Sequence, residues 1–552
     1  MAKKVLIVGG VAGGASAACR LRRLDESAEI IMFERDGYIS FANCGLPYHI
    51  GETIAERSKL IIQTPQSMYN RFRIDVRNFS YVSAIHPETK TVTVQSAEKG
   101  EYEESYDVLV LSPGAAPLKP SLPGLDGSRV YTLRSIMDTD RIKAEVDAKN
   151  AKTAVVVGGG FIGMEMAENL RDRGLEVTLV EAMDQVMPPF DKDMAILLAK
   201  ELHDHGVKLR LGDALAGIEE KDDQAVVSLA SGKQLSADMV VLAIGVRPDT
   251  EFLQGSGIQL GPKGHIVVDE QLRTNLPDVY AVGDAIQVKD FVTGEDTAIP
   301  LAGPANKQGR IVADVIAGLP GSYKATQGSS VVKVFDLTAA CTGANEKTLD
   351  RLGIPYQVIM SHPFSHASYY PGATQLYCKM LFGPEGQIYG GQIIGREGVE
   401  KRVDVLATVM RLGGKVTDLT ELELCYAPPY SSAKDPVNFL GYIAENVLTG
   451  KSRLATWQQT FRRDPETSIL LDVRTVAEYE RDHVEGAVNI PVDELRERLD
   501  ELDKSKTIYE YCMVGIRAHV AYRILAQNGF DVYNITGGWK TYTSLRFDPN
   551  QD

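Results

Sequence analysis

The chain has 552 residues, more than one hydrophobic core normally serves, so we expect three or four domains. Its formal net charge of -15 argues against nucleic acid and membrane surfaces as partners, so any anionic ligand must meet a local basic cluster. No apolar run is long enough for a transmembrane helix, and no metal site is predicted. The cysteines lack the spacing of a disulfide framework, which suits free thiols in a reducing cytoplasm: Cys19, Cys44, Cys341, Cys378, Cys425 and Cys512.

An internal repeat organises the first half of the chain. Residues 5–34 and 154–181 each contain an apolar strand, a Gly-rich turn, a helix and a second strand that ends in an acid. Two such units predict two Rossmann-like dinucleotide-binding domains. Residues 274–285 (TNLPDVYAVGDA) add a buried strand that ends at an aspartate, and SPGAAP (112–117) and AIGVRP (243–248) are interpreted as crossovers between the two domains.

The rest of the chain predicts two further domains, so that the fold class is α/β with one α+β domain. Alternating strands and helices indicate an α+β domain from about residue 330, and a more polar stretch contains the expected linker. A new α/β pattern follows, with SILLDVR, TIYEYC and DVYNITGG as its strands. The expected boundaries are 1–113 with 243–329, 114–242, 330–445, a linker at 446–460, and 461–552.

The second repeat carries a G-x-G-x-x-G motif between a strand and a helix. Gly158 permits the tight turn, Gly160 lets a pyrophosphate approach, and Gly163 allows close packing of helix on strand. Glu181 ends the second strand, where an acid holds a ribose hydroxyl and repels a 2′-phosphate. This unit therefore predicts a pyridine nucleotide site, with NADH favoured over NADPH.

The first repeat departs from that motif, because Val11 stands where the middle glycine is expected. Glu34 occupies the ribose position, followed by Arg35, and Asp284 offers a second acidic contact from the distant 274–285 segment. Over residues 1–445 the chain resembles the pyridine nucleotide–disulfide oxidoreductases, in which such a fingerprint and a distant Gly-Asp pair hold FAD. The resemblance implies that FAD also contacts the turn residues Gly9, Gly10, Ala12, Gly13 and Gly14.

The segment Ser40–Tyr48 contains a single cysteine where glutathione-reductase-like members carry a C-x-x-x-x-C pair. A lone Cys44 cannot close a disulfide with a neighbour, so it must cycle through a mixed disulfide, a persulfide or a sulfenic acid. Gly45 and Pro47 suit the start of a helix, and a helix N-terminus favours the thiolate. We expect Cys44 to be the redox nucleophile that faces the flavin.

The motif around Cys44 resembles the subgroup of coenzyme A-disulfide reductases and NADH oxidases and peroxidases. The oxidase and peroxidase members place a histidine in the first Gly-rich turn, whereas this chain has Ala12 at the matching position and no histidine in residues 1–48. Disulfide or persulfide reduction is therefore favoured. The alternative is an NADH oxidase or peroxidase that cycles Cys44 through a sulfenic acid.

A basic cluster fits the phosphates of coenzyme A. Arg20, Arg22 and Arg23 lie on the first expected helix, and Arg71 and Arg73 lie on a later segment. A solvated helix face is the competing interpretation for each arginine. The resemblance implies CoA contacts at Ser16, Arg20, Arg23, Ser40 and Asn43, with weaker matches at Asn306 and Lys434.

Two tyrosine motifs, SYYPG (368–372) and CYAPPYSSAKDP (425–436), fall in the third domain. In CoA-disulfide reductases, tyrosines of such segments reach the partner's active site in a homodimer. There a phenol can donate a hydrogen bond to a thiolate. The resemblance implies catalytic roles for Tyr426 and for Tyr369, which we prefer to Tyr370.

Residues 461–552 resemble a rhodanese domain, with DVR at 472–474 and GGW at 537–539. The six-residue loop from Cys512 to Arg517 lies between a strand and a helix. Backbone N–H groups of such a loop form an anion cradle that holds a thiolate and stabilises a persulfide on it. The loop is one residue shorter than the Cys-to-Arg loop of related phosphatases, which favours sulfur over phosphate.

Taken together, these features predict an NAD(P)H- and FAD-dependent reductase of CoA disulfide, CoA persulfide or polysulfide, coupled to sulfur transfer at Cys512. Its partners would be small thiols, persulfides and polysulfides. The oxidase or peroxidase is one alternative. A redox sensor or sulfur-carrier protein with a slow reductase half is the other.

Overall fold

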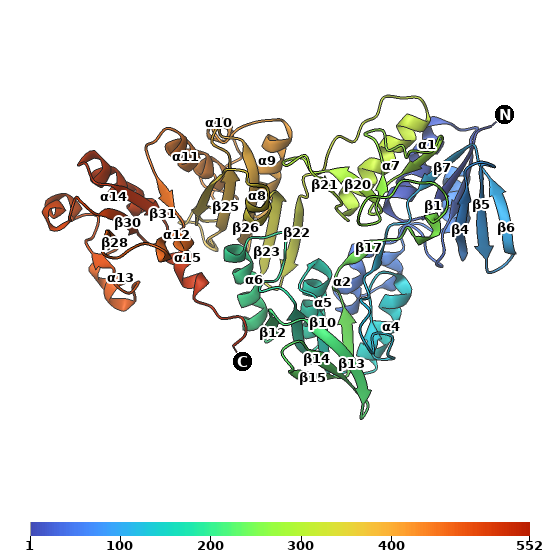
Figure 1. Ribbon diagram of the computed structural model, residues 1–552, viewed down its shortest axis with the longest axis horizontal. Helices are drawn as coiled ribbons and strands as arrows, with labels where there is room; N and C mark the ends of the chain where they lie inside the picture. Colours follow the sequence, from blue (N-terminus) through green and yellow to red (C-terminus); the bar gives the residue numbers. More distant parts are fainter. Residues whose placement is uncertain (1, 552) are drawn as a thin grey trace. The chain divides into compact units, whose positions relative to one another are not determined.

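The computed structural model describes residues 2–551. Figure 1 labels its helices and strands and colours them in chain order. The chain forms two compact units. The first contains the chain up to Asp184 and Gly212–Gly328. The second contains Gln185–Leu211 and the chain from Ser329 onward.

A parallel sheet forms the core of the first unit, in the order β19-β7-β1-β2-β3. Its central strands are almost wholly buried on both faces, as expected for parallel strands covered by helices. Helices α1 (Ala12–Leu24) and α7 (Ala302–Ile316) pack against each other. The strands are β1 (Lys4–Val8), β2 (Glu29–Phe33), β3 (Ile74–Arg77), β7 (Val108–Leu111) and β19 (Val279–Ala281).

The predicted repeat is present as a second parallel sheet in the first unit, which contains β11-β10-β16-β9 in that order. Its strands are β9 (Val130–Tyr131), β10 (Thr153–Val157), β11 (Glu176–Glu181) and β16 (Met239–Leu242), and helix α5 (Phe161–Asp172) follows β10. The two expected crossovers pair as antiparallel strands, β8 (Ala115–Pro117) and β17 (Val246–Pro248). The first unit also contains two antiparallel three-stranded sheets, with strands β4 (Ser80–His86), β5 (Thr91–Ser96), β6 (Gly100–Ser105), β13 (Leu215–Lys221), β14 (Gln224–Leu229) and β15 (Gln234–Ala237).

The second unit begins with an antiparallel sheet in the order β22-β23-β26-β25-β24, as expected for an α+β domain. Helices α8 (Glu346–Leu352), α9 (Glu400–Arg411) and α11 (Pro436–Leu448) accompany it. Its strands are β22 (Ser330–Val334), β23 (Leu337–Gly343), β24 (Gln357–Ser361), β25 (Tyr377–Phe382) and β26 (Ile388–Gly395).

A buried ion cluster explains why the segment Gln185–Leu211, which lies inside the predicted domain 114–242, belongs to the second unit instead. The side chain of Lys379 on β25 is fully buried, and its Nζ lies 2.7 Å from Asp193 Oδ1 and 3.2 Å from Asp191 Oδ2. Glu346 is its third carboxylate partner. A buried lysine needs such partners, so helix α6 (Lys192–Asp204) is fixed to the antiparallel sheet.

The C-terminal domain has a parallel sheet in the order β27-β31-β30-β28-β29, and its three main strands match the predicted ones. The linker prediction is corrected, because 446–460 contains the end of α11, the edge strand β27 (Leu454–Ala455) and most of α12 (Trp457–Phe461). The other elements are β28 (Ser468–Asp472), β29 (Val488–Asn489), β30 (Thr507–Tyr511), β31 (Val532–Ile535), α13 (Val476–Arg481), α14 (Ile516–Gln527) and α15 (Gly538–Leu545). Within residues 2–551, no helix is long and apolar enough to cross a bilayer.

Candidate functional site

The two Gly-rich turns of the first unit repeat the same steric device. A Cβ on Gly163 would lie 1.8 Å from the carbonyl oxygen of Gly158, and one on Gly14 would lie 1.9 Å from that of Gly9. Gly158 and Gly9 have φ values of +110° and +97°, which side-chain-bearing residues rarely adopt. Both turns therefore bring a helix N-terminus close to its strand, the arrangement that binds a pyrophosphate. Gly160 faces open space, so a phosphate can approach its backbone.

The acids predicted at the ends of the second strands hold these turns. Glu181 accepts backbone N–H bonds from Gly159 at 2.7 Å and from Met183 at 2.8 Å. Glu34 accepts one from Gly10 at 3.0 Å, and burial raises its pKa. Burial also raises the pKa of Asp284, and Arg35 pairs with Asp249 at 2.7 Å. The geometry of both turns fits the pyrophosphate of a dinucleotide.

Cys44 is exposed and lies in a short 3₁₀ turn (Asn43–Gly45) that leads into the five-residue helix α2 (Leu46–Ile50). The position before a helix agrees with the prediction. The surroundings do not favour the thiolate, contrary to the prediction. Partial burial raises the pKa of Cys44, and so do the negative charges of Glu165 and Asp284. A helix this short offers only a weak dipole against two acids.

Glu165 on α5 is the missed acid beside Cys44. Its side chain accepts a hydrogen bond from the Tyr48 hydroxyl at 3.1 Å, and burial raises its pKa to about 7. Tyr48 follows Cys44 on α2, and Glu165 stands two residues after Gly163. No local pattern singles out Glu165, because its contact with Tyr48 depends on how α2 packs against α5.

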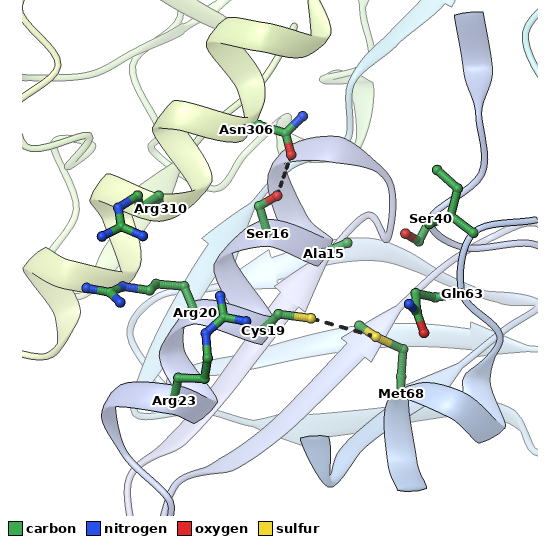
Figure 2. A pocket seen from close by; sticks show the side chains of 11 residues that line it. Ala15, Ser16, Cys19, Arg20, Arg23, Ser40, Gln63, Met68, Asn306 and Arg310 are labelled. Carbon is green, nitrogen blue, oxygen red and sulfur yellow. Dashed lines mark hydrogen bonds between the residues drawn. The ribbon is translucent and has the colours of Figure 1, made fainter. Parts of the chain in front are cut away.

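A pocket of about 300 Å³ is lined by residues of α1, α7, the Ser40–Gln63 region and α3 (Pro65–Phe72) (Figure 2). It brings together five of the residues predicted to bind CoA. Ser16 donates a hydrogen bond to Asn306 at 2.5 Å across the two helices. The lining residues are Ala15, Ser16, Cys19, Arg20, Arg23, Ser40, Ile62, Gln63, Met68, Asn306 and Arg310.

Three guanidinium groups line the pocket. Arg20 pairs with Asp314 at 2.8 Å. Arg23 and Arg310 are exposed and make no hydrogen bond or ion pair with any residue that the structure describes. Arg310 was missed because it lies on α7, almost three hundred residues away from α1 in the chain. The pocket therefore offers two cationic groups to an anionic ligand.

Three of the predicted basic contacts lie elsewhere. Arg22 is buried and caps backbone carbonyls, including that of Phe72 at 2.7 Å, so it is structural. Arg71 and Arg73 do not line the pocket. Asn43, next to Cys44, is exposed and also outside the lining, and Lys434 is an exposed residue of the second unit.

The two predicted tyrosines of the second unit lie side by side. Their hydroxyl oxygens are 2.7 Å apart, and this hydrogen bond raises the pKa of Tyr369. Tyr369 is 74% exposed and Tyr426 is 47% exposed, an unusual position for large aromatic side chains. Cys425, Lys401 and Tyr430 line a hollow beside Tyr426. A pair of accessible phenols can act on a thiolate brought to this surface.

The C-terminal domain places Cys512 at the end of β30, in a loop that leads to α14. Cys512 is almost fully buried, and its Sγ accepts the backbone N–H of Gly515 at 3.1 Å. Gly515 has a φ of +104°, a conformation that suits glycine and turns its N–H toward the sulfur. This N–H is one contact of the anion cradle that the sequence predicts.

Arg517 closes the loop but is already paired. Its guanidinium donates two hydrogen bonds to Glu478 on α13, at 2.6 and 2.8 Å. The pair holds the pKa of Glu478 down to about 2, so this carboxylate stays ionised at any ordinary pH. The positive charge of Arg517 is thus locally balanced beside Cys512.

Comparison with known families agrees with the order of domains along the chain. The pyridine nucleotide-disulphide oxidoreductase profile matches residues 3–309, its dimerisation domain matches 329–436, and the rhodanese-like domain matches 455–545. The rhodanese match begins within the stretch predicted as a linker, as the position of β27 requires.

Individual relatives are similar over most or all of the chain. A coenzyme A disulfide reductase of Staphylococcus haemolyticus is 36% identical over 81% of this chain and 100% of its own length. The reduced CoADR-RHD protein of Bacillus anthracis is 51% identical, with a TM-score of 0.97 over 99% of this chain and 98% of its own. An NAD-dependent persulfide reductase from A. fulgidus is 35% identical, with a TM-score of 0.90 over 98% and 100%. The chain belongs to the pyridine nucleotide-disulphide oxidoreductase family, as a flavoprotein disulfide reductase that carries a C-terminal rhodanese-like domain.

Proposed function

We propose that this enzyme uses a pyridine nucleotide to reduce coenzyme A disulfide or coenzyme A persulfide at Cys44, and that Cys512 carries sulfane sulfur. The observation that carries the proposal is the pocket of Figure 2, which is lined by Ser40, four residues before Cys44, and by the exposed guanidinium groups of Arg23 and Arg310. Such a pocket suits a thiol whose distant end bears phosphates. The coenzyme A disulfide reductases among the relatives support this choice.

The chain's residues have distinct tasks in this reaction. FAD, when bound, accepts a hydride from the pyridine nucleotide and supplies two electrons to Cys44. The Cys44 thiolate attacks one sulfur of the disulfide, releases one CoA thiolate and keeps the other CoA as a mixed disulfide. Two electrons then cleave this S–S bond. The balance is CoA–S–S–CoA + NADH + H⁺ → 2 CoA–SH + NAD⁺, or CoA–S–SH + NADH + H⁺ → CoA–SH + H₂S + NAD⁺.

We assign the nucleotide contacts to the two turns described above. Glu181 ends β11 and accepts backbone N–H bonds from Gly159 and Met183. A carboxylate at this position suits a ribose hydroxyl and repels a 2′-phosphate, so NADH is preferred to NADPH. Glu34 and Asp284 would hold FAD through its ribose and the Gly-Asp turn. The match to a dimerisation domain supports a homodimer in which Tyr369 and Tyr426 serve the partner's Cys44.

The oxidase or peroxidase alternative has less support. Position 12, at the start of α1, is an alanine, and the first histidine of the chain, His49, is buried with its Nδ1 2.6 Å from the Ile54 carbonyl. An imidazole held there is committed to the backbone. A sulfenic acid on Cys44 would therefore lack a neighbouring histidine.

Mass spectrometry of the purified protein tests the proposal directly. A mass increment equal to CoA on the Cys44 peptide, lost on treatment with NADH, is the expected result. Cys44→Ser should abolish NADH-dependent reduction of CoA disulfide, whereas Cys512→Ser should keep it and lose sulfur transfer. Full turnover of CoA disulfide by Cys44→Ser would refute the proposal. Oxygen or peroxide consumption far faster than disulfide reduction would favour the alternative.

A further inference from the structure

An acidic side chain lies inside the core of the rhodanese-like domain, two residues before Cys512. Glu510 is on β30, the middle strand of the five-stranded sheet, and is 0% exposed. Alternation along a strand puts Ile508, Glu510 and Cys512 on one face. Ile508 and Cys512 belong to the core that α14 covers, whereas Tyr509 and Tyr511 pack with Trp457 on the other face. The carboxyl group therefore projects into the apolar layer that contains the Cys512 thiol.

Nothing in the described part of the chain satisfies this carboxyl group. Both of its oxygens are buried without a hydrogen-bond partner. Asn534, the residue opposite Glu510 on the neighbouring strand β31, also has its Oδ1 buried without a partner. The neighbour on β28 is the apolar Leu471. Natural cores rarely keep such a group, because a leucine of similar size would fit without the cost of desolvation.

The surroundings keep Glu510 neutral. Burial raises its pKa well above the usual value, and negative charge on Cys512 raises it further. Cys512, directly after β30, and Tyr522 on α14 are the titratable side chains of the surrounding core cluster. Because Glu510 and Cys512 cannot easily both be ionised, a negative charge on the sulfur requires the carboxyl group to keep its proton.

We propose that Glu510 is a positioning residue whose neutral carboxyl group, lying behind Cys512, stabilises negative charge on Sγ as sulfane sulfur leaves. This inference rests on the proposed role of Cys512 as a sulfur carrier. The step is R–S⁻ + Cys512–Sγ–SH → R–S–SH + Cys512–Sγ⁻. The bond between R–S and the outer sulfur forms, the Sγ–S bond breaks, and its electron pair goes to Sγ. The sulfur transfer needs no outside oxidant or reductant.

The geometry explains why a buried acid suits this step. Before transfer the negative charge is on the attacking thiolate, and afterwards it is on Sγ, the sulfur nearest the core. The Gly515 N–H already approaches Sγ from the loop side, at 3.1 Å. The carboxyl group adds a dipole from the core side, where a low dielectric strengthens its effect.

Single-turnover sulfur transfer by the full-length enzyme tests this inference. Cys512 is loaded with inorganic polysulfide, excess donor is removed, and loss of one sulfur mass from the Cys512 peptide is followed after CoA thiol is added. Glu510→Leu should slow this step about tenfold at neutral pH. Glu510→Gln, which keeps a neutral donor, should stay within about threefold of wild type. The matched control Glu497→Gln changes an exposed acid of the same domain and should behave as wild type.

The pH profile separates this role from a purely structural one. The wild-type rate should fall at alkaline pH as Glu510 ionises, and Glu510→Gln should lose that fall. Wild-type transfer in Glu510→Leu, or an unchanged alkaline limb in Glu510→Gln, would overturn the inference, as would equal slowing of both variants. Failure of wild-type Cys512 to load sulfur would instead overturn the proposed sulfur-carrier function. NADH-dependent reduction of CoA disulfide should be unchanged in all variants, and thermal unfolding confirms that each one folds.

Discussion

The substitution Arg310→Ala tests whether the pocket between α1 and α7 holds the phosphates of the substrate. A hydrogen bond to a charged group contributes about 1.5–3 kcal/mol when it is sheltered. Arg310 is exposed, so solvent screening reduces this to about 1 kcal/mol. The KM for CoA disulfide should therefore rise about fivefold while kcat is unchanged. The double variant with Arg23→Ala should raise KM about thirtyfold if the two contacts are independent.

Steady-state kinetics with NADH and CoA disulfide measure this effect. Arg71→Ala is the matched control, because it removes the same charge from an exposed residue outside the pocket. It should leave KM within about twofold of wild type. The difference between the variants should shrink as ionic strength rises, because salt screens exposed charges. Equal changes in KM for Arg310→Ala and Arg71→Ala would refute the assignment of the pocket and would point to the overall field of the protein.

Three further predictions concern charged groups. Glu165→Gln should lower the pKa of Cys44, because above pH ~7 an ionised carboxylate disfavours the thiolate. The pH dependence of Cys44 alkylation measures this shift, and an unchanged pKa would contradict the reasoning. Lys379→Met should destabilise the second unit by about 3–5 kcal/mol, because it leaves three acids together without their cation. Urea unfolding at neutral pH measures this loss, and wild-type stability would show that the acids are protonated. Glu478→Gln should lower the KM for thiosulfate about fivefold in a cyanide-coupled assay, because Arg517 becomes free to bind an anion. A raised KM would instead show that the ion pair orients Arg517 productively.

The features that could be predicted from the sequence are those encoded by neighbouring residues. The fingerprints at Gly9 and Gly158 could be inferred because the turn, the helix start and the terminal acid all lie within about thirty residues of chain. The loop from Cys512 to Arg517 is equally local, and its Gly515 takes the backbone conformation that such a loop needs. Cys44 was identified from its motif and its place before a short helix.

The features that were missed depend on contacts between distant segments. The sequence places Arg20, Arg22 and Arg23 on one helix, but only packing shows that Arg22 turns inward to carbonyls at the end of α3 (Pro65–Phe72). Arg310 meets the pocket because α7 lies along α1. The raised pKa of Cys44 likewise reflects partial burial and the charge of Glu165 on another helix, which oppose the effect expected from α2 alone.

The path of the backbone has a practical consequence. The polypeptide passes from one compact unit to the other three times, after residues 184, 211 and 328. No single cleavage can therefore release two complete units. A truncation after residue 328 would remove Lys379, the partner of Asp193, and the sheet that covers the apolar face of α6. Such a chain is suited to being made, folded and degraded as one piece.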